Sequence, residues 1–465
     1  MKPKRTLDFT KGSILKKLIV FTIPIILSNL LQHFYTMTDR IVVGRFAENG
    51  EIALAAVGST GQATALILNL FVGVAIGANV VCSNLRGARK GKELREAMHS
   101  SLILAGIFGV FLMILGVCIA KPVLRMMNTP ESVLRDSALY MRIYFLGVPA
   151  SLLYNFSSAI LRAHGDTRRP MYILAASGLV NVSLNLVLVM VFHLDVAGVA
   201  IATITAQYIS ATTALIILFR KNDEYKLTFK ELKLHKAQVK KMVSIGVPCG
   251  INGIVFNISN VTVQSAVNSF NDPIIMSGST VAADLTTLVY QVLVAFYTAC
   301  ISFTGQCYGA RLYKRIDKLV VRSVLLSAGL VSAMAALVTV FHRPIMALYT
   351  DNPAVIDAGR VKMIMIAWGY ILYGASEIFL GCLRGMGRSS LPTLFNLLSI
   401  CVPRLMWVAF IFPLNRTFNF LFVCYPISWV VSLSVQSWYF FYCRRKDNRK
   451  LRQTEEAGCG LPRPV

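Results

Sequence analysis

The chain has 465 residues, of which 55% are hydrophobic and only 15% are charged, and its mean hydropathy is +0.61. A soluble domain carries roughly 25% charged residues, so this composition excludes an ordinary soluble globular protein. The net charge of +25 would suggest nucleic-acid binding in a soluble chain. Here the cations fall in alternate loops between apolar stretches, which is a sign of membrane topology, so we expect membrane lipid and no nucleic acid as a partner.

About a dozen stretches are apolar and long enough to cross a bilayer, which takes about 20 residues each. In chain order they are residues 16–43, 53–84, 97–120, 134–163, 170–193, 196–219, 240–270, 275–307, 319–342, 354–383, 390–413 and 418–443. These runs are far longer than the roughly 10-residue strands of a membrane barrel. We therefore predict an all-α integral membrane protein with twelve transmembrane helices.

The two halves of the chain repeat each other. Leu-Arg-Ala-His-Gly at 161–165 returns as Leu-Arg-Gly-Met-Gly at 383–387, and Pro24 returns as Pro248. Duplicated apolar chains are typical of transporters, whose substrate path lies where the halves meet. Each recurring proline interrupts a span, where it is either a hinge or a kink that neighbouring side chains accommodate.

The repeat predicts two pseudo-symmetric six-helix lobes, residues 1–219 and 242–443. A basic linker at 220–241 joins them, and a charged tail follows at 444–465. Loops at 86–95, 162–169 and 311–322 are rich in Lys and Arg, as the linker is. The loops that alternate with them along the chain contain few cations. By the positive-inside rule, the linker, the tail and both termini should be cytoplasmic.

The ten cysteines are scattered, mostly inside the spans, and their spacing is not that of a metal knuckle. We expect neither a metal site nor a cofactor.

The acidic residues Asp39, Asp284 and Glu377 fall within predicted spans, away from the span ends. A carboxylate in the bilayer costs at least a few kcal/mol, which binding of a proton, a cation or a basic partner can offset. Asp39 continues a polar stripe on one helix face, formed with Asn29, Gln32 and Thr36. The stripe indicates a helix that faces a cavity. The alternative is that Asp39 is an interfacial charge near the end of its helix.

Other polar side chains of the first half lie in later spans: Asn155 in the fourth, Asn181 and Asn185 one turn apart in the fifth, and Thr203 in the sixth. We expect them to converge with Asp39 into an ion-coupling pocket. For any single asparagine, an interhelical hydrogen bond worth about 0.6–2 kcal/mol is an equally simple interpretation.

The second half has its own intramembrane polar residues, which are candidates for a substrate cavity or a second ion site: Asn257, Asn260, Asp284, Gln291, Glu377 and Arg404. Glu377 occupies the position that corresponds to Asn155. An acid and a base in adjacent spans suggest an ion pair between Glu377 and Arg404, with a substrate or gating site at Glu377 as the alternative. Asp284 has no obvious basic partner, so it remains a candidate for the second ion site.

An ordered set of short motifs resembles the multidrug and toxic compound extrusion (MATE) family, and within it the bacterial DinF-like branch. The matching pieces are Pro24 and residues 39–45, 55–58, 86–88, 161–167, 181–185, 198–203, 305–306, 309–310 and 383–387. Each piece is unspecific alone, but together they cover nearly the whole chain in the expected order.

The resemblance implies a monomeric antiporter of the bacterial inner (plasma) membrane, with two lobes around a V-shaped cavity. It would export organic cations, drugs or metabolites in exchange for Na⁺ or H⁺. Asp39 matches the family's first-span ion-site aspartate, and Asn155, Asn181 and Thr203 match its polar partners. Asn185 departs from the Asp of many relatives, which leaves the identity of the coupling ion open.

Two other functions are weighed. A lipid-linked saccharide flippase of the same superfamily would need a strongly cationic cavity, and Arg404 is the one cation that the sequence clearly places in the bilayer. A membrane-embedded enzyme would need a catalytic set such as His, Asp and Glu within a span, and no such set is evident, so we do not expect an enzyme.

Overall fold

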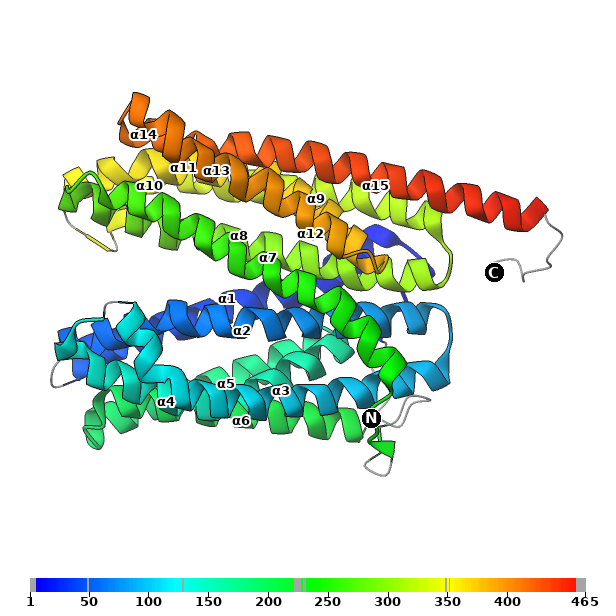
Figure 1. Ribbon diagram of the computed structural model, residues 1–465, viewed down its shortest axis with the longest axis horizontal. Helices are drawn as coiled ribbons and strands as arrows, with labels where there is room; N and C mark the ends of the chain where they lie inside the picture. Colours follow the sequence, from blue (N-terminus) through cyan, green and yellow to red (C-terminus); the bar gives the residue numbers. More distant parts are fainter. Residues whose placement is uncertain are drawn as a thin grey trace. The chain divides into compact units, whose positions relative to one another are not determined.

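The computed structural model describes residues 6–47, 50–127, 129–220, 227–228, 231–347, 349–350 and 352–456. Every regular element in these ranges is a helix (Figure 1). Twelve of the helices are long and apolar enough to span a membrane, which confirms the predicted fold class. Parts of the predicted linker, at 221–226 and 229–230, and of the predicted tail, at 457–465, lie outside the described residues.

The first six spans lie where the apolar stretches predict them. Their helices are α1 (Ile14–Phe46), α2 (Gly50–Gly87), α3 (Gly91–Met126), α4 (Glu131–Ala163), α5 (Arg168–Leu186) and α6 (Asp195–Phe219). Beyond its last α-helical residue, α5 continues as a π-helical segment, η1 (Val187–Val191). Helices satisfy every backbone polar group internally, which is why such apolar runs fold this way in lipid.

The last six spans are more irregular. They comprise α7 (Lys236–Asn268), α8 (Pro273–Gly309), α9 (Tyr313–Val340), the short α10 (His342–Ala347), α11 (Pro353–Gly385), an eleventh span in pieces, α14 (Phe418–Phe422) and α15 (Cys424–Glu456). The pieces of the eleventh span are α12 (Ser390–Asn396), η3 (Leu397–Cys401), α13 (Val402–Met406), η4 (Trp407–Ile411) and η5 (Phe412–Leu414). Two of them, η3 and η4, are π-helical, so the α-helical turn of α13 lies between two π segments.

Two helices start with the same N-cap motif. The Asp272 side chain accepts a hydrogen bond from Ile274 N at 2.8 Å just before Pro273, and Asn352 accepts one from Ala354 N at 3.0 Å just before Pro353. An Asx cap followed by proline satisfies an amide that has no partner within the helix, and proline fixes φ for the first helical residue. These capping residues set the starts of α8 and α11.

The chain packs as two compact units, and α1 and α7 are each divided between them. The first unit contains the residues up to Asp8 and Ile23–Ile251, and the second contains Phe9–Thr22 and Asn252–Val465. The divisions fall beside Pro24 in α1 and near Pro248 in α7. The predicted lobes meet at the linker, whereas these units divide within the two equivalent helices.

Phe9 anchors the first segment of the second unit. Its side chain is fully buried, and its ring lies 4.8 Å from that of Phe21 and 4.5 Å from that of Phe303. Its amide donates to Gln306 Oε1 at 3.0 Å, and its carbonyl accepts from Arg315 Nε at 2.6 Å. This combination of aromatic packing and backbone hydrogen bonds fixes the chain just before α1.

In the first unit, α2 crosses the first part of α7 with the backbones in direct contact. A Cβ atom on Gly246 would lie 2.4 Å from Val74 Cα, and one on Gly250 would lie 2.4 Å from Leu70 Cα. On α2, a Cβ atom on Gly77 would lie 2.2 Å from the carbonyl oxygen of Met242. Small residues at a helix interface allow this close approach in membranes.

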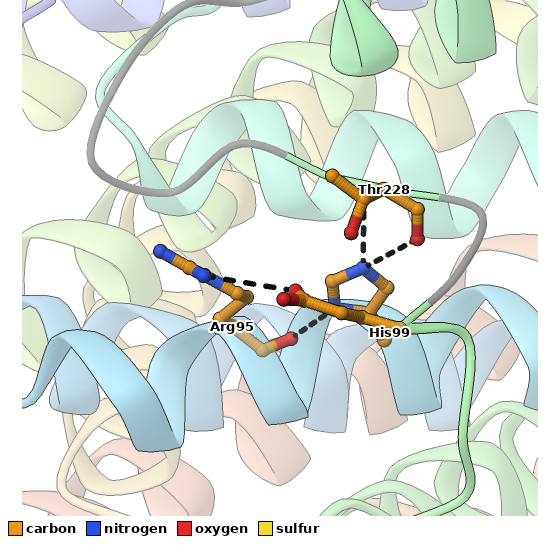
Figure 2. Close-up of polar contacts among 4 residues, drawn as sticks. Arg95, His99 and Thr228 are labelled. Carbon is orange, nitrogen blue, oxygen red and sulfur yellow. Dashed lines mark hydrogen bonds and ion pairs between the residues drawn. The ribbon is translucent and has the colours of Figure 1, made fainter.

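The described part of the linker is attached to α3. Figure 2 shows His99 of α3 between its own helix and Thr228: Nδ1 is 2.8 Å from the Arg95 carbonyl oxygen, and Nε2 is 3.2 Å from both backbone polar atoms of Thr228. Next to it, Ser100 Oγ accepts a hydrogen bond from His235 N at 2.9 Å. Because His99 and Ser100 are buried, these contacts hold the linker to the first unit.

Candidate functional site

Four of the predicted ion-coupling residues meet in the first unit around the carboxylate of Asp39. Asn185 Nδ2 donates to Asp39 Oδ1 at 2.5 Å, and Thr203 Oγ1 donates to Asp39 Oδ2 at 3.4 Å. Asn181 joins the cluster through Thr203 Oγ1 at 3.5 Å and through Asn185 Nδ2, which lies 3.3 Å from Asn181 Oδ1. Three spans, α1, α5 and α6, thus bring one acid and three neutral polar groups together.

The Asp39 cluster, defined as Asp39, Asn181, Asn185 and Thr203, combines an unneutralised carboxylate with an unused acceptor. Asn185 is fully buried, and its Oδ1 has no hydrogen-bond partner. Asp39 takes part in no ion pair within the described ranges. A buried oxygen without a donor costs about 1–3 kcal/mol, and a buried charge costs more. The cluster itself is therefore rich in oxygen and contains no basic group, while the charge of the neighbouring Arg40 acts on Asp39 without forming an ion pair. Such an oxygen-rich environment suits a small cation or a proton.

The helix positions of these residues explain how they meet. Asn181 and Asn185 are one turn apart on α5, so both amides share a face, and the π segment η1 begins two residues after Asn185. Such π-helical segments are rare and often lie at functional sites. One turn beyond Asp39, Val42 and Val43 pack with Val189 of η1 and with Val199 of α6 in a buried apolar cluster. This packing fixes α1 against the π segment and thereby positions the carboxylate.

Three other predicted residues of the first half do not join the cluster. Gln32 and Thr36 are exposed, and Thr36 Oγ1 donates to the Gln32 carbonyl oxygen of its own helix at 3.1 Å. Asn155 Nδ2 donates to the Ser151 carbonyl oxygen, one turn earlier in α4, at 2.9 Å. The sequence could not exclude Asn155, because an amide in a helix can bond either across to a neighbouring helix or back to its own backbone.

In the second unit, the predicted ion pair between Glu377 and Arg404 is wrong. Arg404 Nε donates to Ser428 Oγ at 3.2 Å, and Arg404 Nη1 donates to Asn260 Oδ1 at 3.2 Å. The basic group whose charge acts on Glu377 is Arg384 of the same helix, and not Arg404. Adjacent spans do not guarantee facing side chains, because the rotation of each helix decides which residues meet.

Asp284, the other candidate acid of the second unit, has a basic neighbour, Lys362, that the sequence analysis did not identify. Lys362 of α11 is only 5% exposed, and its Nζ donates to Ser279 Oγ at 2.7 Å and to the Ser279 carbonyl oxygen at 2.9 Å. The charges of Lys362 and Asp284 interact, so Asp284 is not an isolated carboxylate. A count of cations inside the predicted spans would have found Lys362, since it lies within 354–383. Asn257 and Gln291 are half-buried on α7 and α8.

Comparisons with known proteins identify the family of the chain. The MatE family model matches residues 24–187 and 248–408. "Probable multidrug resistance protein YoeA" of Bacillus subtilis (strain 168) is 28% identical, with 97% of this chain and 99% of that protein aligned. "Multidrug export protein MepA" of Staphylococcus aureus (strain NCTC 8325 / PS 47) is 21% identical, with 89% and 92% aligned.

A solved structure shares the fold. The structure described as "Outward-facing conformation of a multidrug resistance MATE family transporter of the MOP superfamily" superposes with a TM-score of 0.88 at 18% identity, covering 97% of this chain and all of the other. The two separate segments matched by the family model begin at Pro24 and at Pro248, the recurring prolines of the repeat.

Proposed function

The chain belongs to the MatE family of multidrug efflux transporters, and from this premise we propose that it is a secondary antiporter. It exports organic cations, drugs or metabolites in exchange for Na⁺ or H⁺. The protein works as a monomer in the bacterial plasma membrane, with both termini in the cytoplasm, as the basic loops indicate. Asp39 binds the coupling ion.

The observation that carries this proposal is the unpaired Asn185 Oδ1 beside the Asp39 carboxylate. The Asp39 cluster contains five side-chain oxygens. They are the two carboxylate oxygens of Asp39, the amide oxygens of Asn181 and Asn185, and the hydroxyl of Thr203. Oxygen atoms are the ligands that hard cations prefer. A proton is the alternative ligand, because it removes the negative charge of the carboxylate and turns Asp39 into a donor.

Ion binding at Asp39 is coupled to movement through the bend of α1. Pro24 lacks an amide hydrogen and removes one hydrogen bond from the helix, and Ser28 Oγ donates back to the Pro24 carbonyl oxygen at 2.7 Å. Such back-bonding bends helices. The bend lies where α1 passes from the second unit to the first, so a change of bend there affects a helix that both units share.

The test is efflux of a fluorescent organic cation from vesicles that contain the purified protein, with Na⁺ and pH gradients imposed separately. Asp39→Asn keeps the shape of the side chain but removes its charge, so we expect normal insertion and loss of gradient-driven efflux. Asp357→Asn makes the same chemical change in α11 of the second unit, where the carboxylate forms an exposed 3.9 Å ion pair with Arg343, and should leave efflux unchanged. Undiminished gradient-driven export by Asp39→Asn would refute the proposed role.

A further inference from the structure

Arg404 is a buried positive charge without a counterion. Its side chain is only 1% exposed, although it lies well inside the eleventh span, Ser390–Leu414. Nε and Nη1 donate to the neutral oxygens of Ser428 and Asn260, and Nη2 has no partner. Within the described ranges, Arg404 forms no ion pair with any acid. An arginine in the bilayer without a negative partner is expensive and usually functional.

Three aromatic rings surround the guanidinium and leave its charge in place. The ring centroids of Tyr425, Phe256 and Trp429 lie 4.1, 5.5 and 5.8 Å from Arg404 Cζ. Cation–π contacts offset part of the free-energy cost of burying an ion, but aromatic rings carry no negative charge. The aromatic cage therefore holds the guanidinium in place but does not neutralise it.

The backbone around Arg404 points to the same conclusion independently. The five residues of α13 lie between the π segments η3 and η4, and Pro403 precedes the arginine. Interrupted helices are where transporters bind their substrates, because the irregular backbone lines a site. In the first unit, the π segment η1 follows the Asp39 cluster in the equivalent span. Each unit thus places an unneutralised charge beside a π segment, negative in the first unit and positive in the second.

We propose that Arg404 binds a carboxylate of the transported substrate, which makes the preferred cargo an aromatic acid or zwitterion. Nη2 offers two N–H donors, and a carboxylate can receive both from a guanidinium. One uncompensated positive charge matches a monoanion and not a dianion such as a phosphate ester. The flat faces of the cage residues suit an aromatic body beside the carboxylate. This inference rests on the proposed function, since it names the substrate of the same transporter.

Because Arg404 is buried in this structure, the experiment reports both binding and transport. A rhodamine with a free carboxylate and the methyl ester of the same dye are a matched pair of cargoes for vesicle efflux. Benzoate and methyl benzoate are a matched pair of ligands for thermal unfolding of the purified protein. Both pairs differ by one negative charge and little else.

Asn260→Asp is the most informative variant, because it places a built-in carboxylate 3.2 Å from Arg404 Nη1 with almost no change in shape. We expect efflux of the carboxylate dye to fall at least about tenfold, while efflux of the ester stays within about twofold of wild type. Arg404→Gln should give the same selective loss. Asn252→Asp is the control: it lies two turns away on α7, where the side chain accepts from Asn396 Nδ2 at 3.0 Å and not from a cation.

Benzoate should raise the unfolding temperature of the wild type and not that of Asn260→Asp, with no difference for methyl benzoate. Equal losses for both dyes, or loss for neither, in Asn260→Asp and Arg404→Gln would overturn the assignment. So would stabilisation by chloride but not by benzoate. If the wild type exports neither dye, the proposed function fails, and the benzoate measurement still decides separately whether Arg404 binds a carboxylate.

Discussion

Replacing Gly246 by alanine should destabilise the protein, although alanine normally favours a helix. The added Cβ would lie 2.4 Å from Val74 Cα, 2.8 Å from the Gly73 carbonyl oxygen and 3.0 Å from Val74 N. Carbon atoms in contact prefer separations of about 3.5–4.0 Å, so the α2 and α7 backbones must move apart by about 1 Å. Overpacking of this kind costs typically 1–3 kcal/mol, and we expect the upper end because every obstructing atom belongs to the backbone.

The separation of α2 and α7 would also disturb the second close contact, between Gly250 and Leu70. The gain in helix propensity from Gly to Ala is up to about 1 kcal/mol, too small to offset the loss. The matched control is Gly329→Ala in α9, where nothing lies within 4 Å of the added Cβ, and this variant should be as stable as the wild type or more so. Thermal unfolding of the purified proteins, followed by circular dichroism, measures both shifts. Shifts of the same sign, or an unchanged midpoint for Gly246→Ala, would refute the argument that backbone contact fixes this crossing.

Two further predictions concern the N-terminal segment before α1 and the linker. Phe9→Ala removes a fully buried ring, and such changes lower the free energy of unfolding by about 3–5 kcal/mol. Residues 6–13 should therefore exchange amide hydrogens much faster, while α8 stays protected. Unchanged exchange would contradict the anchoring role of Phe9. His99→Ala leaves Thr228 without its buried partner and should speed trypsin cleavage within 221–236 severalfold. Arg95→Gln, which removes the exposed 3.6 Å ion pair with Glu231, should leave the cleavage rate unchanged. Equal acceleration by both variants would show that His99 does not hold the linker.

The sequence predicted the features that depend on one-dimensional patterns. The twelve spans follow from apolar length, and the Asn181–Asn185 pair follows from helical periodicity. The meeting of these asparagines with Asp39 and Thr203 was expected because each residue marks a polar face on a helix that is otherwise apolar. A polar face in an apolar helix must be buried against another polar face or line a cavity.

The errors concern rotation and backbone register, which the pattern does not encode. Arg404 faces Asn260 of α7 and Ser428 of α15, and not Glu377, because its place along the eleventh span does not determine the direction of its side chain. The π segments η3 and η4, which flank Arg404, each shift the hydrogen-bond register of the helix and so rotate the side chains on either side of them. No residue type in the sequence predicts such a segment. Lys362 was missed because it lies nearer to the start of its predicted span, 354–383, than Arg404 lies to either end of 390–413.

The division of α1 and α7 has a consequence for how such a chain can be cut and rebuilt. The opening turns of α1 belong to the second unit, and the opening half of α7 belongs to the first, so each half of the polypeptide supplies the other with the start of its own first helix. A protein severed within the linker should therefore regain its fold only when both fragments are present together. A half-length ancestor built on this plan would have needed a second copy to complete it, and tandem fusion turns that mutual exchange into a single covalent chain.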